Sequence, residues 1–144
     1  MAEIRKYPDA AVLADAAAEM FVAFAQKAIE TSARFSVALS GGSTPKALFA
    51  RLASPKFANQ IDWSHVHLFW GDERCVPPDH ADSNYRMTRE GLLDHVRIPA
   101  ANVHRMQGEI DPSQAANAYE DELRAFFGTA QPRFDLVMLG MGDD

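Results

Sequence analysis

Three short polar segments of this sequence could bind or transform a small anionic ligand. They read SGGSTP at residues 40–45, GDER at residues 71–74 and GMGDD at residues 140–144. Each follows a short apolar run of the kind that forms a buried strand. Parallel strands place their carboxyl ends at one edge of a sheet, and open α/β sheets bind ligands at that edge. We therefore expect the three segments to lie together.

The first segment has the residue types of an anion-binding turn. Gly41 and Gly42 can adopt positive φ and let a ligand approach the backbone closely. Ser43 or Thr44 can cap the helix that Pro45 opens. The free N–H groups and the positive end of that helix would then face a phosphate. The alternative is an ordinary strand-to-helix turn without a ligand. A nucleotide P-loop is excluded, because that motif has glycine where this sequence has proline.

The second segment places two carboxylates and a guanidinium where a strand leaves the core. Arg74 could hold a phosphate or a carboxylate through two parallel hydrogen bonds. Asp72 and Glu73 could act as a base or hold hydroxyl groups. A surface cluster of ion pairs is the alternative interpretation, and it would be preferred if this segment stood alone.

Other candidate chemistries have weaker support in the sequence. GMGDD begins like a dinucleotide fingerprint, but it follows the last strand and lacks the sixth position of that motif. His65 and His67 would share one face of a strand, yet further metal ligands at suitable spacing are not evident, so we expect no metal site. Cys75 follows Arg74, whose charge can lower a thiol pKa, but no partner histidine is identified. The G-x-S-x-G elbow of serine hydrolases is absent.

Length and composition predict one globular domain spanning residues 1–144. The chain has 47% hydrophobic and 24% charged residues and a net charge of −6. We therefore expect neither nucleic acid nor an anionic membrane as a partner, and an anionic ligand must be held by local groups. The single cysteine, the absence of a long apolar run and the lack of a signal-peptide pattern favour a cytoplasmic location.

The apolar periodicity predicts alternating helices and strands. We expect helices over residues 9–30, 45–52, 83–96 and 111–127, and strands over residues 35–40, 65–73, 102–106 and 134–142. In the first helix, Asp9 is the expected N-cap, and the expected buried face comprises Leu13, Ala17, Met20, Phe21, Phe24 and Ala28. In the last helix, Asp111 and Pro112 form the start and Gly128 the stop. The expected buried stripe of that helix comprises Ala115, Tyr119, Leu123 and Phe126. This alternation predicts an α/β fold with a doubly wound, mostly parallel sheet.

Taken together, the motifs resemble the 6-phosphogluconolactonase family. SGGSTP, then WGDERCVPPDHADSNYRM, then LGMGDD match that family in order and roughly in spacing. The middle block is the most specific. The related glucosamine-6-phosphate deaminases share the glycine turn and an acidic pair, but they typically differ around DSNYRM, so the lactonase resemblance is preferred.

The resemblance implies a function and a set of site residues. The reaction would be hydrolysis of 6-phospho-D-glucono-1,5-lactone to 6-phospho-D-gluconate in the oxidative pentose phosphate pathway, with no cofactor or metal. Arg74 would bind the phosphate, and Asp72 would lie close to the sugar. The residues that would line the sugar-phosphate site are Gly41, Gly42, Ser43 and Thr44.

The sequence departs from the family pattern at its end. In the family, GDD continues into Gly-His, and that histidine is the presumed general base, oriented by the residue that matches Asp144. The 144 residues stop at Asp144. We therefore expect a fragment or an incomplete gene product with little lactonase activity, whose apolar last strand is partly exposed. An amino-sugar phosphate deaminase or isomerase, or a non-catalytic phosphosugar-binding fragment, are the alternatives. The oligomeric state is not predicted.

Overall fold

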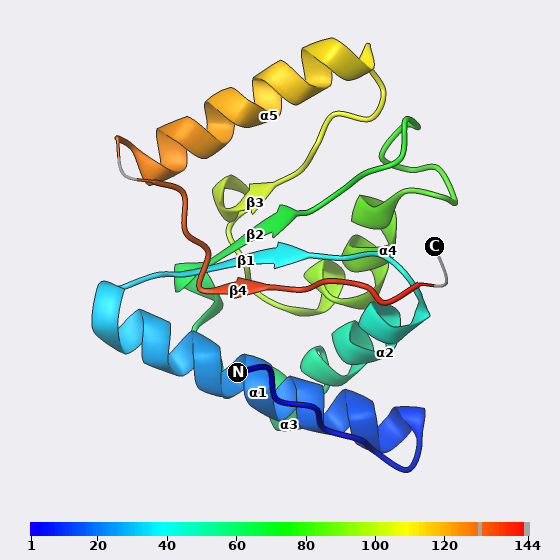
Figure 1. The fold of residues 1–144 in the computed structure, drawn as a ribbon, viewed down its shortest axis with the longest axis vertical. Coiled ribbons are helices and arrows are strands. Elements are labelled where there is room, and N and C mark those ends of the chain that lie inside the picture. Colours follow the sequence, from blue (N-terminus) through cyan, green and yellow to red (C-terminus); the bar gives the residue numbers. More distant parts are fainter. Residues whose placement is uncertain (130, 143–144) are drawn as a thin grey trace.

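A parallel four-stranded sheet forms the centre of the computed structural model, which describes residues 1–129 and 131–142 (Figure 1). The strands are β1 (Phe35–Leu39), β2 (Val66–Trp70), β3 (Val103–His104) and β4 (Leu136–Val137). Their order is β3-β2-β1-β4, and every pairing is parallel. The chain thus winds from β1 to one side and then returns to place β4 on the other. The expected doubly wound α/β sheet is confirmed.

The helices follow the predicted alternation with local differences. They are α1 (Ala10–Ser32), α2 (Ser43–Leu52), α3 (Pro55–Ala58), α4 (Asn84–Gly91) and α5 (Pro112–Phe127). The helix expected over residues 83–96 ends at Gly91, and a separate 3₁₀ turn covers Leu93–His95. The strand expected over residues 134–142 pairs with β1 only at Leu136 and Val137.

The first helix has its predicted cap, and Phe21 and Ala28 of its predicted face are buried, but the rest of the face differs. The Asp9 carboxylate accepts a hydrogen bond from the Val12 N–H at 2.9 Å. The expected burial of Met20 and Phe24 is wrong, because these side chains are 41% and 40% exposed. The buried face consists of Ala14, Ala18, Phe21, Val22, Ala25 and Ala28. Four of these six are alanines, and their small size lets α1 lie close to the sheet.

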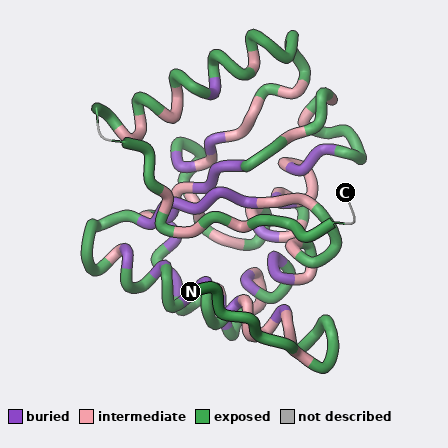
Figure 2. The backbone as a smooth tube through the Cα atoms, viewed as in Figure 1, coloured by how far each residue is buried: buried purple, intermediate pink, exposed green. Residues whose placement is uncertain are grey.

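Alternate strand residues face two different layers. Val37 of β1 and Leu68 of β2 belong to the main hydrophobic core, which also contains residues of α1, α2 and α3. On the other face, the Phe69 ring contacts the Phe126 ring of α5 with a centroid distance of 5.0 Å. Figure 1 shows α5 and α1 on opposite sides of the molecule. Figure 2 shows the buried residues concentrated in β1 and β2.

The last strand is an edge strand with little cover on one face. Leu136 and Met138 pack against the core, whereas Val137 and Leu139 are 49% and 84% exposed. Partial exposure of this apolar segment was expected from the sequence. Its start is held by Asp135, whose carboxylate accepts hydrogen bonds from the Ser36 N–H and hydroxyl, each at 2.8 Å.

Tyr119 ties α5 to the end of β2. Its hydroxyl oxygen accepts a hydrogen bond from the Trp70 N–H at 2.9 Å, and the carbonyl oxygens of Trp70 and His104 lie 3.2 Å away. β3 pairs with β2 only through Leu68 and Phe69, so the tyrosine hydroxyl takes the place of a strand partner at Trp70. Of the predicted stripe on α5, Tyr119 is buried and Ala115, Leu123 and Phe126 are half-buried.

Replacing Tyr119 with phenylalanine should destabilise the protein. The substitution leaves the buried Trp70 N–H without its acceptor, which costs about 1–3 kcal/mol of unfolding free energy. Urea unfolding followed by tryptophan fluorescence measures the change. Tyr85→Phe is the control, because no described hydrogen bond uses the Tyr85 hydroxyl, and we expect a change within about 0.5 kcal/mol. Equal unfolding free energies for Tyr119→Phe and the wild type would contradict this role.

Two histidines form a hydrogen-bonded pair beneath α5. His104 Nδ1 lies 2.7 Å from Glu122 Oε1, and His67 Nδ1 lies 3.1 Å from His104 Nε2. His65 lies in a 3₁₀ turn instead of the strand, so the expected common strand face of His65 and His67 is wrong. Within residues 1–129 and 131–142, no group of three or more histidine, cysteine or carboxylate side chains could hold a metal.

The histidine pair should make stability depend on pH. Burial, followed by the neighbouring charge of His104, lowers the pKa of His67 below its ordinary value of 6.5. Below that pH the unfolded chain binds a proton that folded His67 does not, so the free energy of unfolding falls as the solution is acidified toward the folded pKa. Urea unfolding at about pH 7.5 and about pH 5.5 measures this loss.

The variant His67→Gln should reduce that pH dependence. Glutamine keeps a polar side chain at this position but does not titrate. His95→Gln, at an exposed position, is the matched control and should leave the dependence unchanged. A wild-type loss on acidification that is identical in His67→Gln would show that other groups cause it.

Candidate functional site

The candidate site lies where the chain reverses its winding direction. The segments after β1 and β4 leave neighbouring strands at the same edge of the sheet. They line a cavity of about 660 Å³ with residues 40–45 on one side and 138–142 on the other. Leu13, Ala14 and Ala17 of α1 and Leu48 of α2 complete its lining. Crevices of this kind at a topological switch point are the usual ligand sites of open α/β sheets.

The glycine turn presents the start of α2 to this cavity. Gly42 is the N-cap with φ +104°, a conformation that requires glycine, and it makes no side-chain cap. Ser43 and Thr44 lie inside the first helical turn, so the predicted capping by either side chain is wrong. Within the described part of the chain, no hydrogen bond uses the N–H groups of Gly42, Ser43 or Thr44. These donors and the positive helix end suit an anion.

Gly41 is required for a different reason. A Cβ at this position would lie 2.8 Å from Cγ of Asn84, the first residue of α4. The Asn84 Nδ2 in turn donates to the backbone carbonyl of Asp72 at 3.2 Å. The Asn84 side chain thus contacts both the glycine turn and the segment after β2. The sequence indicated this residue only as part of DSNYRM.

Glu73 holds the segment after β2 on the start of α4. Its carboxylate accepts hydrogen bonds from the N–H groups of Arg74 at 2.7 Å, Asn84 at 2.8 Å and Tyr85 at 2.9 Å. The Ser83 hydroxyl donates to it at 3.1 Å. Both carboxylate oxygens are therefore engaged by the protein, so Glu73 serves the fold, in contrast to the sequence hypothesis of a base or hydroxyl ligand.

Asp72 and Arg74 point outward on either side of Glu73. Both side chains are 62% exposed, and Arg74 Nε lies 4.0 Å from Asp72 Oδ2. An exposed pair at this distance contributes little to stability, so its members can be recruited by a ligand. These two residues stand at the same sheet edge as the glycine turn, but they are not among the residues that line the cavity beside it.

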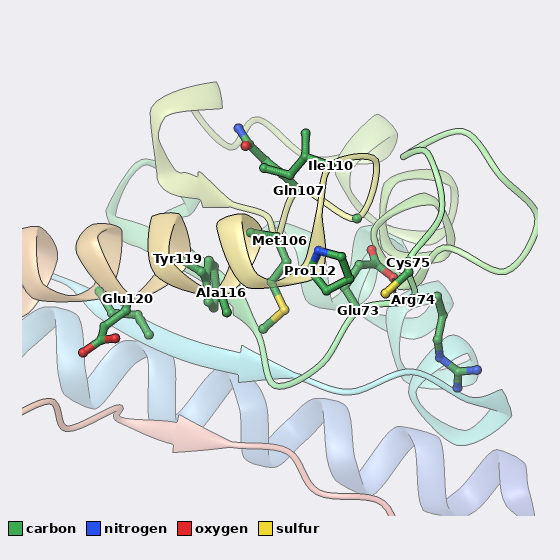
Figure 3. Close-up of a pocket in the computed structure, with 13 residues that line it drawn as sticks. Glu73, Arg74, Cys75, Met106, Gln107, Ile110, Pro112, Ala116, Tyr119 and Glu120 are labelled. Atoms are coloured by element: carbon green, nitrogen blue, oxygen red, sulfur yellow. Dashed lines mark hydrogen bonds between the residues drawn. The ribbon is translucent and has the colours of Figure 1, made fainter.

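A second cavity lies between α5 and the segments that follow β2 and β3. Its volume is about 350 Å³, and Met106, Ile110 and Pro112 contribute to its largely apolar lining. Arg74 borders this cavity, but Figure 3 shows its guanidinium extending away from Met106 and Pro112. The start of α5 beside this cavity is capped by the Asp111 carboxylate, which accepts hydrogen bonds from the Ser113 and Gln114 N–H groups, whereas the start of α2 has no side-chain cap. The exposed Cys75 also borders this cavity.

The fold brings most of the predicted site residues to one edge of the sheet. The glycine turn, Asp72 and Arg74 are joined there through Asn84. Asp144, the remaining predicted site residue, lies outside the described residues, so its expected role stays a prediction.

Comparison with known proteins agrees with this arrangement. The family model of glucosamine-6-phosphate isomerases/6-phosphogluconolactonase matches residues 8–144. The 6-phosphogluconolactonase of Nostoc sp. is 43% identical over 141 residues, covering 95% of this chain and 57% of the relative. The solved 6-phosphogluconolactonase from Trypanosoma cruzi superposes with a TM-score of 0.86 at 32% identity, covering 99% of this chain and 59% of that protein.

The fold and the site define a parallel α/β protein with a glycine turn at the switch point of its sheet. The chain belongs to the glucosamine-6-phosphate isomerase/6-phosphogluconolactonase family, and the resemblance to its lactonase members is confirmed. It spans somewhat more than half the length of the relatives that it matches. A monomeric glucosamine-6-phosphate deaminase shares the fold alone, with a TM-score of 0.75 at 13% identity over 87% of this chain and 51% of that protein. Among the described residues, no helix is long and apolar enough to cross a membrane.

Substituting Gly42 with alanine should remove ligand binding at the turn. An L side chain at φ +104° carries a backbone strain of about 1–3 kcal/mol, and relief of that strain would turn the N–H groups away from the cavity. Gly128→Ala is the matched control, because Gly128 also has positive φ, at +68°, and ends α5 away from the site. Phosphate binding followed by ³¹P NMR should be lost in Gly42→Ala and kept in Gly128→Ala. Unchanged binding in Gly42→Ala would contradict the role of the turn.

Proposed function

We propose that these residues form the phosphosugar-binding part of a hydrolase that opens 6-phospho-D-glucono-1,5-lactone to 6-phospho-D-gluconate. The observation that carries this proposal is the position of the glycine turn. The start of α2 borders a cavity at the switch point of the sheet, and Asn84 connects this turn to the segment that carries the exposed Asp72 and Arg74. Membership of the family and the lactonase relatives support the substrate.

Each proposed residue has a role that its surroundings support. The N–H groups of Ser43 and Thr44, aligned with the α2 dipole, favour an anionic ligand. Arg74 has an exposed guanidinium that can form two parallel hydrogen bonds to phosphate oxygens. Asp72 can accept hydrogen bonds from sugar hydroxyls. Binding energy from the phosphate, remote from the reacting carbon, would hold the lactone in position.

The chemical step requires a general base. A neutral imidazole would accept a proton from water as the water oxygen bonds to the lactone carbonyl carbon. Hydrogen-bond donors would stabilise the oxyanion of the tetrahedral intermediate. The bond to the ring oxygen then breaks, and the ring oxygen takes up the proton. The resemblance assigns the imidazole to a histidine that follows the GDD motif, with Asp144 orienting it, and the 144 residues do not contain that histidine.

Replacing Arg74 with alanine should weaken phosphosugar binding. Loss of a hydrogen bond to a charged group costs about 1.5–3 kcal/mol, so we expect the Kd for 6-phospho-D-gluconate to rise about 10- to 100-fold. Isothermal titration calorimetry on the 144-residue chain measures it. Arg97→Ala is the control, because Arg97 is exposed beside Trp63 and Ser64, at the opposite end of β2. Equal affinities for Arg74→Ala and the wild type would contradict this assignment.

Turnover separates the lactonase from its alternatives. We expect the 144 residues to bind 6-phospho-D-gluconate and to hydrolyse the lactone little faster than water does. Lactone hydrolysis well above the spontaneous rate and abolished by Arg74→Ala would overturn that expectation about catalysis. Binding without turnover by any longer form of the protein would favour a non-catalytic phosphosugar-binding function.

The second candidate function is deamination or isomerisation of an amino-sugar phosphate. The family description includes glucosamine-6-phosphate isomerases, and a deaminase shares the fold. Release of ammonia from glucosamine 6-phosphate would favour this alternative.

A cytoplasmic location is proposed for either function. The single cysteine, Cys75, is free and exposed, as is usual for proteins in a reducing cytoplasm.

A further inference from the structure

We propose that Asn84 is a positioning residue that holds the glycine turn and the Asp72 segment in one fixed arrangement. The identity of the ligand rests on the proposed function. The contacts come from the structure alone: Asn84 is 6% exposed and lies between these two segments.

The Asn84 amide makes a direct contact on each side. Its Nδ2 donates to the Asp72 carbonyl oxygen at 3.2 Å and faces the Asp72 carboxylate, Oδ1, at 3.4 Å. On the other side, the amide lies against Gly41 so closely that a Cβ there would be 3.1 Å from Nδ2 and 2.8 Å from Cγ. One side chain therefore sets the spacing between the segments that follow β1 and β2.

The backbone of Asn84 is held at both of its polar groups. Its N–H donates to the Glu73 carboxylate at 2.8 Å, and its carbonyl accepts a hydrogen bond from the Thr88 hydroxyl at 3.0 Å. Thr88 is fully buried. Because Glu73 lies between Asp72 and Arg74 in the chain, any shift of α4 would move these two residues and the support of Gly41 together.

This arrangement matters for ligands that contact more than one segment. A phosphosugar held by the α2 N–H groups, Asp72 and Arg74 at once needs their relative positions fixed to within about 0.5 Å. Asp72 and Arg74 are exposed and paired only loosely with each other, so their own contacts do not fix them. The buried amide of Asn84 contacts Gly41 and donates to Asp72, and so fixes the relative positions of these two segments.

A matched residue separates positioning from general stability. Asn102 is a second buried asparagine, 9% exposed, whose Nδ2 donates to the Ser64 carbonyl at 3.0 Å. Its partner Ser64 precedes β2, at the opposite edge of the sheet from the candidate site. Asn84→Ala and Asn102→Ala each remove one buried amide and leave one backbone carbonyl without its donor. We expect similar losses of thermal stability from the two variants.

Binding of 6-phospho-D-gluconate to the 144-residue chain is the first test. Isothermal titration calorimetry should give a Kd about tenfold or more higher for Asn84→Ala and within about twofold of the wild type for Asn102→Ala. A Kd for Asn84→Ala that stays within about twofold of the wild type would overturn the proposal. If Asn84→Ala does not fold, Asn84→Ser removes the amide that donates to Asp72 without adding a charge, and it carries the same expectation.

A double-mutant cycle tests the contact without any ligand. Gly41→Ala should lower Tm in the wild type, and it should lower Tm by less than about half as much in an Asn84→Ala background, where the new methyl group has room. Equal Tm losses in both backgrounds would overturn the proposed contact. If the wild type binds no 6-phospho-D-gluconate, the proposed function fails, and this cycle alone decides whether Asn84 couples the two segments.

Discussion

The arrangement of the site depends on the pairing of β1 with two parallel neighbours. β1 is buried along its whole length and pairs with β2 on one edge and β4 on the other. This pairing brings the ends of three strands to one edge, so segments far apart in the sequence meet there. The chain winds away from β1 in both directions, which opens a crevice between the segments that follow β1 and β4.

Two polar side chains convert this sheet edge into a defined surface. Glu73 binds the start of α4 through backbone N–H groups, and Asn84 extends from that helix to the glycine turn. Glu73 and Asn84 lie among the candidate ligand-binding residues in sequence, yet their side chains serve the arrangement of their neighbours. The exposed Asp72 and Arg74 are left to meet a ligand.

The sequence predicted the order of the strands and that the glycine turn, Asp72 and Arg74 lie at one edge of the sheet. These predictions follow from local apolar patterns and from the rule that parallel strands end at the same edge. The sequence identified Phe21 and Ala28 of the buried α1 face but was wrong about Met20 and Phe24, because the rest of the tightly packed side consists of small residues, mainly alanines, and Val22. It indicated Asn84 only as part of DSNYRM and did not predict its contact with Gly41. Asn84 contacts Gly41, which is 43 positions away in the sequence (84 minus 41), so no local sequence pattern could predict this contact. Asp144 stays a prediction.

The most direct measurement is a titration of the ¹⁵N-labelled 144-residue chain with 6-phospho-D-gluconate, followed by amide NMR. If the sheet edge is one phosphosugar site, the amide signals of Gly42, Ser43 and Thr44 and the side-chain signal of Arg74 should shift together and yield one common Kd. Shifts confined to residues around Met106 and Pro112, or no shifts at the glycine turn, would contradict the account.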